Sequence, residues 1–145
     1  MLELEIESIR VRQETQQRAV VLRVKDSDLY LPIFIGPFEV EAIRFKLMDV
    51  EVQRPMTHDL LGSVIGDLGA TVESIVVSDL QNDTFYAKIV MNYNGNVVEV
   101  DSRPSDAIAL AVRANVPIFA SDDVIEKAAV TLAVEDAEEE SAESA

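Results

Sequence analysis

Two short segments of the sequence, residues 54–59 and 101–106, combine arginines, carboxylates and hydroxyl groups that could act on a phosphate. Each contains an Arg-Pro pair followed a few residues later by an aspartate, and the first also holds His58, the single histidine of the chain. A histidine can move a proton near neutral pH, and a neighbouring carboxylate can orient its ring. A guanidinium on a rigid proline corner can hold a phosphate through two hydrogen bonds. These residue types fit phosphodiester hydrolysis.

Eight side chains of the two segments are the candidates for such a site. The expected catalytic residues, which would move a proton or position a water, are His58, Asp59, Asp101 and Asp106. The expected substrate-binding residues, which would hold the phosphate, are Arg54, Thr57, Arg103 and Ser105. An alternative interpretation is structural. The arginines would then pair with nearby aspartates and brace the two corners, and His58 would be a surface residue in the first turn of a helix.

Carboxylates near both segments could also hold a divalent cation such as Mg²⁺, which prefers oxygen ligands and keeps several waters. Asp101 and Asp106 are the pair that we expect to bind it. Such a cation would place positive charge where the phosphodiester must lie. The alternative is that acids at helix starts, such as Glu39 and Glu41, only complement the helix dipole. Because the chain has no cysteine and one histidine, a zinc site is not expected.

Composition limits what the protein can be. Its 145 residues suffice for one domain with a hydrophobic core. The net charge of −15 argues against a general nucleic-acid-binding protein, since phosphate binding needs clustered Lys and Arg. Short or single-stranded substrates are therefore expected rather than long duplexes. No apolar run is long enough to span a bilayer, and the first residues lack the basic start of a signal peptide, so a cytoplasmic protein without membrane contact is predicted.

The elements that would position the two segments follow from the spacing of apolar residues. Strands are expected at residues 3–12, 18–24, 29–35, 70–80, 84–92, 96–100 and, briefly, 116–120. Helices are expected at residues 38–48, 60–68, 104–114 and 121–132. Thr57 is the predicted N-cap of the second helix, Gly69 its stop, and Ser121 the N-cap of the last helix. Asn94-Gly95 predicts a type I′ hairpin turn.

A weak internal repeat suggests how these elements are arranged. Residues 6–11 match residues 72–77, and residues 41–43 match residues 106–108, which makes Glu41 equivalent to Asp106. Each half reads strand–strand–strand–helix. We therefore predict a single α+β domain over residues 1–132, in which duplicated β-β-β-α units form a mixed or antiparallel sheet packed by helices. Residues 133–145 are predicted to be an acidic, disordered tail, and exposed sheet edges favour a homodimer.

Four ordered motifs, at residues 31–36, 54–61, 68–70 and 101–111, resemble the bifunctional nuclease (BFN) family. The resemblance runs from about residue 3 to residue 130; the acidic tail departs from it, and no appended second domain is expected. It implies an α/β fold that associates as a dimer and a nuclease that acts on both DNA and RNA. The resemblance brings no catalytic assignment, so the roles above are inferred from the residues. The alternative class is a non-enzymatic binding or regulatory module, whose corners are structural or bind a small anion or a partner protein.

Overall fold

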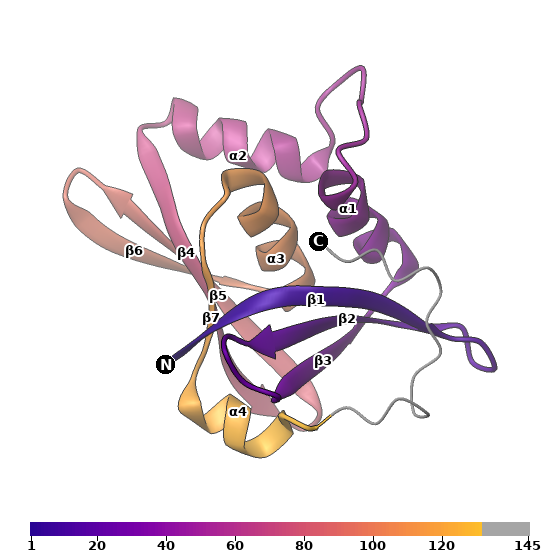
Figure 1. The fold of residues 1–145 in the computed structure, drawn as a ribbon. Helices are drawn as coiled ribbons and strands as arrows, with labels where there is room; N and C mark the ends of the chain where they lie inside the picture. Colours follow the sequence, from indigo (N-terminus) through magenta and orange to yellow (C-terminus); the bar gives the residue numbers. More distant parts are fainter. Residues whose placement is uncertain (132–145) are drawn as a thin grey trace.

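Within residues 1–131, which the structure describes, seven strands form one mixed sheet and four helices pack against it (Figure 1). The structure is a computed structural model. In chain order the elements are β1 (Leu2–Arg12), β2 (Gln17–Val24), β3 (Tyr30–Ile35), α1 (Pro37–Leu47), α2 (Thr57–Asp67), β4 (Ala70–Gln81), β5 (Thr84–Tyr93), β6 (Asn96–Ser102), α3 (Pro104–Ala114), β7 (Ile118–Ala120) and α4 (Asp122–Ala128). The α+β class is confirmed.

Two antiparallel three-stranded units flank a short central strand. The sheet order is β3-β2-β1-β7-β4-β5-β6, and β7 runs antiparallel to β1 and parallel to β4. The unit β1-β2-β3 leads into α1, and the unit β4-β5-β6 leads into α3. Both units carry a register shift at the same place of the matched segments, between Ile6 and Ser8 and between Val72 and Ser74. The predicted β-β-β-α duplication is therefore visible in the sheet.

The duplication aligns different acids from those that the sequence matches suggested. Pro37 and Pro104 each occupy the first turn of their helices, where a fixed φ and a missing N–H cost nothing. Counting from these starts, Glu39 and Asp106 are both third helical residues. The structural counterpart of Asp106 is therefore Glu39, and the predicted equivalence with Glu41 is corrected.

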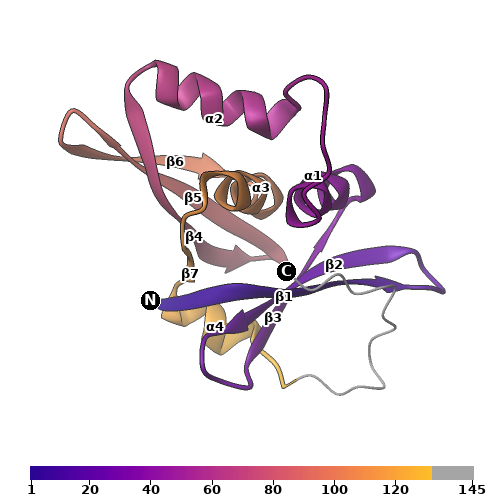
Figure 2. The same ribbon diagram turned by 45° about the horizontal axis from the view of Figure 1, so that its top comes forward.

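Helices α1, α2 and α3 cover one face of the sheet, and α4 lies on the opposite side (Figures 1 and 2). Helix α3 is the most deeply buried, because residues 107–111 alternate Ala with Ile and Leu and are all buried in the core. Small side chains let its backbone approach the sheet closely. By contrast, none of the residues of α2 is buried. Helix α2 is thus an outer layer packed on α3, and this packing brings the two Arg-Pro segments together.

The turn and cap residues predicted from the sequence are confirmed, with one exception. Gly69 has a φ of 93°, Asn94 and Gly95 both have positive φ, as a type I′ turn requires, and the Ser121 hydroxyl accepts from the Val124 N–H. The exception is Thr57. Helix α2 begins at Thr57 itself and Met56 is the N-cap, because the Asp59 carboxylate accepts the Met56 N–H at 2.9 Å.

Two expectations concern residues at the end of the chain. The last helix was expected to reach residue 132, but α4 ends at Ala128, and Val130 exchanges backbone hydrogen bonds with Tyr30 of β3 instead, so this prediction is wrong. The predicted acidic tail at residues 133–145 lies outside the described residues. No helix in the part of the chain that the structure describes has the length and apolar character needed to cross a membrane.

Candidate active site

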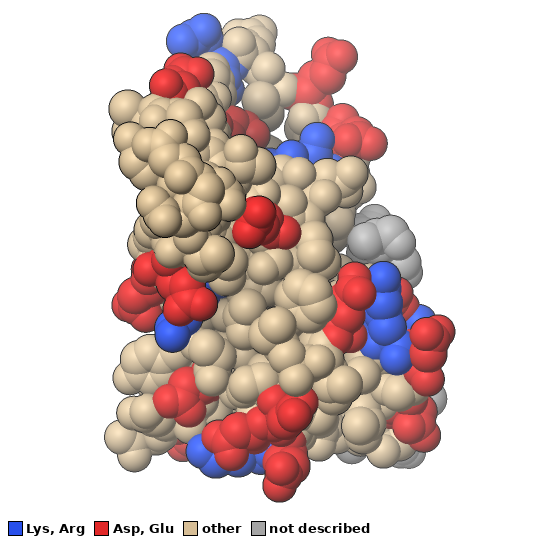
Figure 3. Space-filling model, turned by 90° about the vertical axis from the view of Figure 1, so that its left-hand side faces the viewer, with Lys and Arg blue, Asp and Glu red and all other residues tan. Residues whose placement is uncertain are grey.

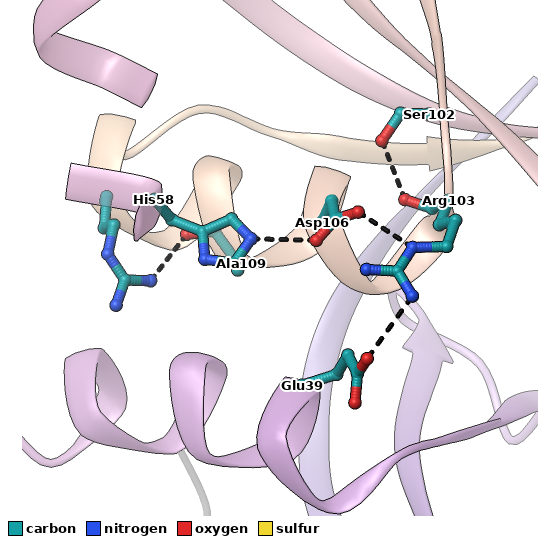
Figure 4. Close-up of polar contacts among 7 residues, drawn as sticks. Glu39, His58, Ser102, Arg103, Asp106 and Ala109 are labelled. Atoms are coloured by element: carbon teal, nitrogen blue, oxygen red, sulfur yellow. Dashed lines mark hydrogen bonds and ion pairs between the residues drawn. The ribbon is translucent and has the colours of Figure 1, made fainter. Parts of the chain in front are cut away.

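Four side chains from three helices and the strand end before α3 form a continuous polar chain (Figure 4). His58 Nε2 lies 2.9 Å from Asp106 Oδ1, and Arg103 Nε donates to Asp106 Oδ2 at 2.9 Å. Arg103 Nη1 also donates to Glu39 Oε2 at 3.3 Å. The structure therefore joins the two predicted segments through the pair His58–Asp106. Arg103 links the two structurally equivalent acids, Glu39 and Asp106.

This polar chain lines an open hollow of about 370 Å³ between α1 and the starts of α2 and α3. The His58 side chain is only 12% exposed, whereas the Arg103 side chain is 64% exposed. A histidine held in this way is shielded on most sides, while the guanidinium beside it is open to a ligand. Thr57 and Glu41 lie on the wall of the same hollow.

Asp106 determines the charge and the hydrogen-bond directions of the polar chain that it forms with His58 and Arg103. Partial burial acts to raise the pKa of the Asp106 carboxyl, but hydrogen bonds from His58 and Arg103 outweigh it, and the pKa of Asp106 lies below its ordinary value. The hydrogen bond to Asp106 likewise raises the pKa of Arg103. Asp106 is thus ionised at neutral pH and accepts the N–H of His58 Nε2. In neutral His58 this leaves Nδ1 as the nitrogen with a free lone pair.

Asp59 makes a separate contact and does not touch His58. Arg113 Nε donates to Asp59 Oδ1 at 2.9 Å, and Arg113 Nη1 donates to the Ala109 carbonyl at 2.9 Å. The Arg113 side chain is 9% exposed. Asp59 therefore caps α2 with one oxygen and anchors it to α3 with the other. This arrangement fixes the position of His58, one residue earlier on the same helix.

We expect Asp59→Asn to flatten the acid dependence of stability. The hydrogen bond from the Met56 N–H lowers the pKa of Asp59, and Arg113 lowers it further. A carboxyl whose pKa is lower in the folded state stabilises the protein above its unfolded pKa, and that contribution is lost as the pH falls through the folded pKa. The melting temperature of the wild type should therefore fall as the pH drops below about 5, and that of Asp59→Asn should fall less.

Thermal unfolding monitored by circular dichroism across this range measures the difference. At pH 7 the variant should be about 1–3 kcal/mol less stable, because a hydrogen bond to a charged group is lost. Glu99→Gln, on an exposed part of β6, is the control. Equal slopes for Asp59→Asn and the wild type would remove the capping and anchoring role from Asp59.

Arg54 and Ser105 lie in hollows that adjoin the central one. Arg54 is on the wall of a hollow of about 410 Å³, which shares Phe45, Met56 and Arg113 with the central hollow. Ser105 is buried and lines a third hollow, of about 370 Å³, which shares Glu39 and Arg103 with the central one. The three hollows adjoin one another through these shared wall residues, and we call the three together the groove.

Asp101 is not brought to this groove. In the β5–β6 register Asp101 pairs with Lys88, and the Lys88 amine contacts Glu99, so these three side chains share one face of the sheet. The alternate residue Val98 faces the other way and lines a hollow with side chains of α2. Because side chains alternate along a strand, the Asp101 carboxylate lies on the face away from α2 and α3.

The predicted Mg²⁺ pair does not form a site. Asp101 and Asp106 lie on different faces of the sheet, and both oxygens of Asp106 are engaged by His58 and Arg103. Across residues 1–131 no three His, Asp or Glu side chains gather closely enough to hold a metal ion. Asp101 and Asp106 therefore do not form the expected Mg²⁺-binding pair, and no chemical step is assigned to a cation.

Two residues of the site were missed in the sequence analysis. Arg113, which anchors Asp59, lies seven residues after Asp106 on α3 and therefore on the same face of that helix. Glu39 was considered only as a cation ligand or for the helix dipole, and its ion pair with Arg103 was not expected. The spacing between Asp106 and Arg113 could have predicted that Arg113 lies near the site. The ion pair of Glu39 with Arg103 could not have been predicted, because it depends on how α1 packs against α3.

A family model described as the bifunctional nuclease domain matches residues 20–133, which include both Arg-Pro segments and the whole groove. The chain belongs to this family. The resemblance drawn from the sequence motifs is thus confirmed, and the groove is a feature of a BFN domain.

Relatives of this BFN-domain chain fall into two groups. An uncharacterized protein of Mycobacterium tuberculosis is 39% identical over 139 residues, which cover 96% of this chain and 83% of that protein. Bifunctional nuclease 1 of Oryza sativa subsp. japonica is 28% identical over 114 residues, 76% of this chain and 34% of the rice protein. Bifunctional nuclease 1 of Arabidopsis thaliana is 29% identical over 104 residues, 69% of this chain and 32% of that protein. The BFN-domain chain spans about a third of these plant proteins.

Proposed function

We propose that this protein hydrolyses phosphodiester bonds of DNA, RNA or both, and that its active-site residues are His58, Asp106 and Arg103. One observation carries the proposal: a hydrogen-bonded His–Asp pair and an exposed arginine line the same hollow. Membership of the bifunctional nuclease domain family, and plant relatives with that name, support it.

His58 is the proton-transfer group in this proposal. Asp106 accepts the Nε2 proton of His58, holds the ring, and stabilises the imidazolium that forms. Nδ1 of His58 then takes a proton from a water molecule as the water oxygen attacks phosphorus. The bond from phosphorus to the leaving oxygen breaks, that oxygen takes up a proton from solvent, and the His58 imidazolium returns its proton to solvent before the next turnover. Asp106 acts through His58 and is a positioning residue.

Arg103 binds the phosphate. Its Nε and Nη1 are held by Asp106 and Glu39, and among the described residues no group accepts a hydrogen bond from its Nη2. A guanidinium fixed at two nitrogens is preorganised for a phosphate oxygen at the third. The charge that builds on phosphorus oxygens in the transition state then meets a cation already in position. Arg54, exposed in the adjoining hollow, would hold a neighbouring phosphate.

Charge favours short or single-stranded substrates. The groove carries Glu39, Glu41 and Asp106 beside its arginines, and the chain has a net charge of −15. Long duplexes need many phosphate contacts, each of which requires a Lys or Arg. A few well-placed arginines suffice for a flexible strand.

Hydrolysis of end-labelled single-stranded RNA, single-stranded DNA and the matching duplexes tests the proposal. We expect cleavage of the single strands that exceeds cleavage of the duplexes. Parallel reactions with EDTA and with added Mg²⁺ measure whether a cation contributes. Absence of cleavage above a buffer blank for all substrates, in both conditions, would contradict the proposal.

A binding or regulatory module is the second candidate, and one observation favours it. Arg103 forms ion pairs with both Asp106 and Glu39, so its position is held without any ligand. In that case a thermal-shift screen should find nucleotides, inorganic phosphate or divalent cations that raise the melting temperature, while no substrate is cleaved. The two candidates therefore differ in the hydrolysis assay.

We also propose that the protein is a homodimer formed through the edge strand β6 and helix α2. Val97 on this edge is 65% exposed, and a mainly apolar hollow of about 390 Å³ between α2 and β6 is lined by Val64, Leu68 and Val98, among others. Figure 3 shows the corresponding side of the molecule, where a broad band of uncharged residues separates groups of charged ones. Val97 and this hollow lie on opposite faces of the sheet beside the β6 edge, and a second copy that pairs its β6 edge would lie against residues on both faces.

Val97→Glu is therefore expected to be a monomer, whereas the wild type is expected to be a homodimer. A buried carboxylate without a partner would oppose the association. Size-exclusion chromatography with light scattering measures the mass. The control is Val130→Glu, at an exposed valine beside β3 on the opposite edge of the sheet. Equal masses for the wild type and Val97→Glu would argue against this interface.

A further inference from the structure

Two exposed phenylalanines flank Arg103 in the groove. Phe38 is 85% exposed and lines the central hollow with His58 and Arg103. Phe34 is 55% exposed and lines the adjoining hollow, which Arg103 shares. Each of the two hollows that meet at the guanidinium thus has one exposed aromatic ring on its wall, beside a second, partly buried phenylalanine (Phe45 or Phe85).

Neither ring contributes much to the core. Phe38 follows Pro37 in the first turn of α1, whose inward side is occupied by the buried Val40 and Ile43. Phe34 lies on β3 next to the buried Ile33 and points to the other side of the strand. Both rings therefore keep a face open on the walls of the hollows, where a flat ligand group can pack against them.

We propose that Phe38 and Phe34 are stacking sites for two nucleobases on either side of the phosphate held by Arg103. The inference rests on the proposed function, and it names unpaired bases as the part of the substrate that is recognised. Every base offers a flat face, so stacking on phenylalanine tolerates any sequence. A base inside a duplex is already stacked on its neighbours and is not free to do this.

Stacking would also explain how a single strand can bind to a site that carries several carboxylates. Glu39 and Glu41 repel the phosphate backbone, and few cations are present to offset this repulsion. Contacts to base faces carry no charge, so they supply affinity that salt does not screen. Binding of a single strand is therefore expected to depend only weakly on salt, in contrast to proteins that bind through many phosphates.

Fluorescence anisotropy with a labelled oligothymidylate carrying phosphorothioate linkages measures binding apart from cleavage. An abasic oligomer of equal length provides the same backbone charge without bases. We expect Phe38→Ala to weaken binding of oligothymidylate about tenfold, with Phe34→Ala having a similar or smaller effect, and neither to change binding of the abasic oligomer. Phe38→Trp should restore binding, since it keeps an aromatic face. Tyr86→Ala, at an exposed tyrosine of β5, is the matched control and should bind as the wild type does.

Three results would overturn the inference: equal binding of both oligomers by the wild type, an unchanged affinity in Phe38→Ala, or equal losses for both oligomers. Because Phe38 and Phe34 are exposed, their replacement should leave the melting temperature unchanged, which thermal unfolding checks. Cleavage of an unmodified strand is followed separately. Base-dependent binding without cleavage would sustain the stacking sites and contradict the proposed hydrolysis, so the two failures are distinguishable.

Discussion

Replacing His58 by alanine is expected to slow hydrolysis of a single-stranded substrate by about 10²- to 10⁴-fold, the usual contribution of a positioned proton-transfer group. The loss should appear in the rate at saturating substrate, since His58 is largely shielded and Arg103 still binds the phosphate. The cost in stability should be about 1.5–3 kcal/mol, because a hydrogen bond to the ionised Asp106 is lost. Single-turnover cleavage of end-labelled RNA measures the rate.

Companion variants separate the role of His58 from a general disturbance of the fold. Asp106→Asn should cause a comparable loss, because an amide in place of the carboxylate no longer stabilises the imidazolium or fixes its tautomer. Glu99→Gln, on the far face of the sheet, should cleave as the wild type does. Asp101→Asn decides whether the sequence-based expectation for Asp101 holds: a large loss would return Asp101 to the site. Equal rates for His58→Ala and the wild type would exclude His58 from the chemistry.

Arg103→Ala is expected to lower the cleavage rate by about 10²- to 10³-fold, because it removes a preorganised cation from the developing charge on the phosphate. Arg103→Lys should recover little of that loss. A lysine amine is a point charge and cannot hold Asp106, Glu39 and a phosphate oxygen in one plane. The KM of both variants should rise as well, since Arg103 contacts the phosphate before and during the reaction.

Thermal unfolding of the same variants distinguishes catalysis from bracing. If Arg103 only stabilises the fold through its ion pairs with Asp106 and Glu39, Arg103→Ala lowers the melting temperature and leaves the cleavage rate per folded molecule unchanged. Glu39→Gln is the matched control. It breaks the ion pair between α1 and Arg103 but leaves the guanidinium in place, so it should lower stability by at most about 1 kcal/mol and retain most of the activity.

Much of the fold could be predicted because its local signals agree with its packing. The prolines at positions 37 and 104 mark helix starts, Asn94-Gly95 marks a hairpin, and alternation of apolar residues marks the strands. The repeat was weak in sequence, yet it shows in the matching register shifts of β1 and β4. The order of the strands, with β7 between the two units, could not be predicted, because the three residues of β7 do not specify which strands they pair with.

The site was only partly predictable. Proximity of His58 to Asp106 depends on α2 lying across α3, and Asp59, Asp101 and Asp106 were equally plausible partners from sequence. Asp101 is excluded from the groove by strand alternation alone. The run Val97-Val98-Glu99-Val100-Asp101 has valines on both faces, so its pattern does not say which face carries the aspartate.

The central claim is that His58 moves a proton during phosphodiester cleavage, and chemical rescue tests it most directly. His58→Ala leaves a space beside Asp106 into which free imidazole can bind. Added imidazole should raise the cleavage rate of His58→Ala in proportion to its concentration, and it should not raise the rate of Arg103→Ala. A His58→Ala rate that does not respond to imidazole, together with wild-type cleavage that does not differ from that of His58→Ala, would contradict the claim.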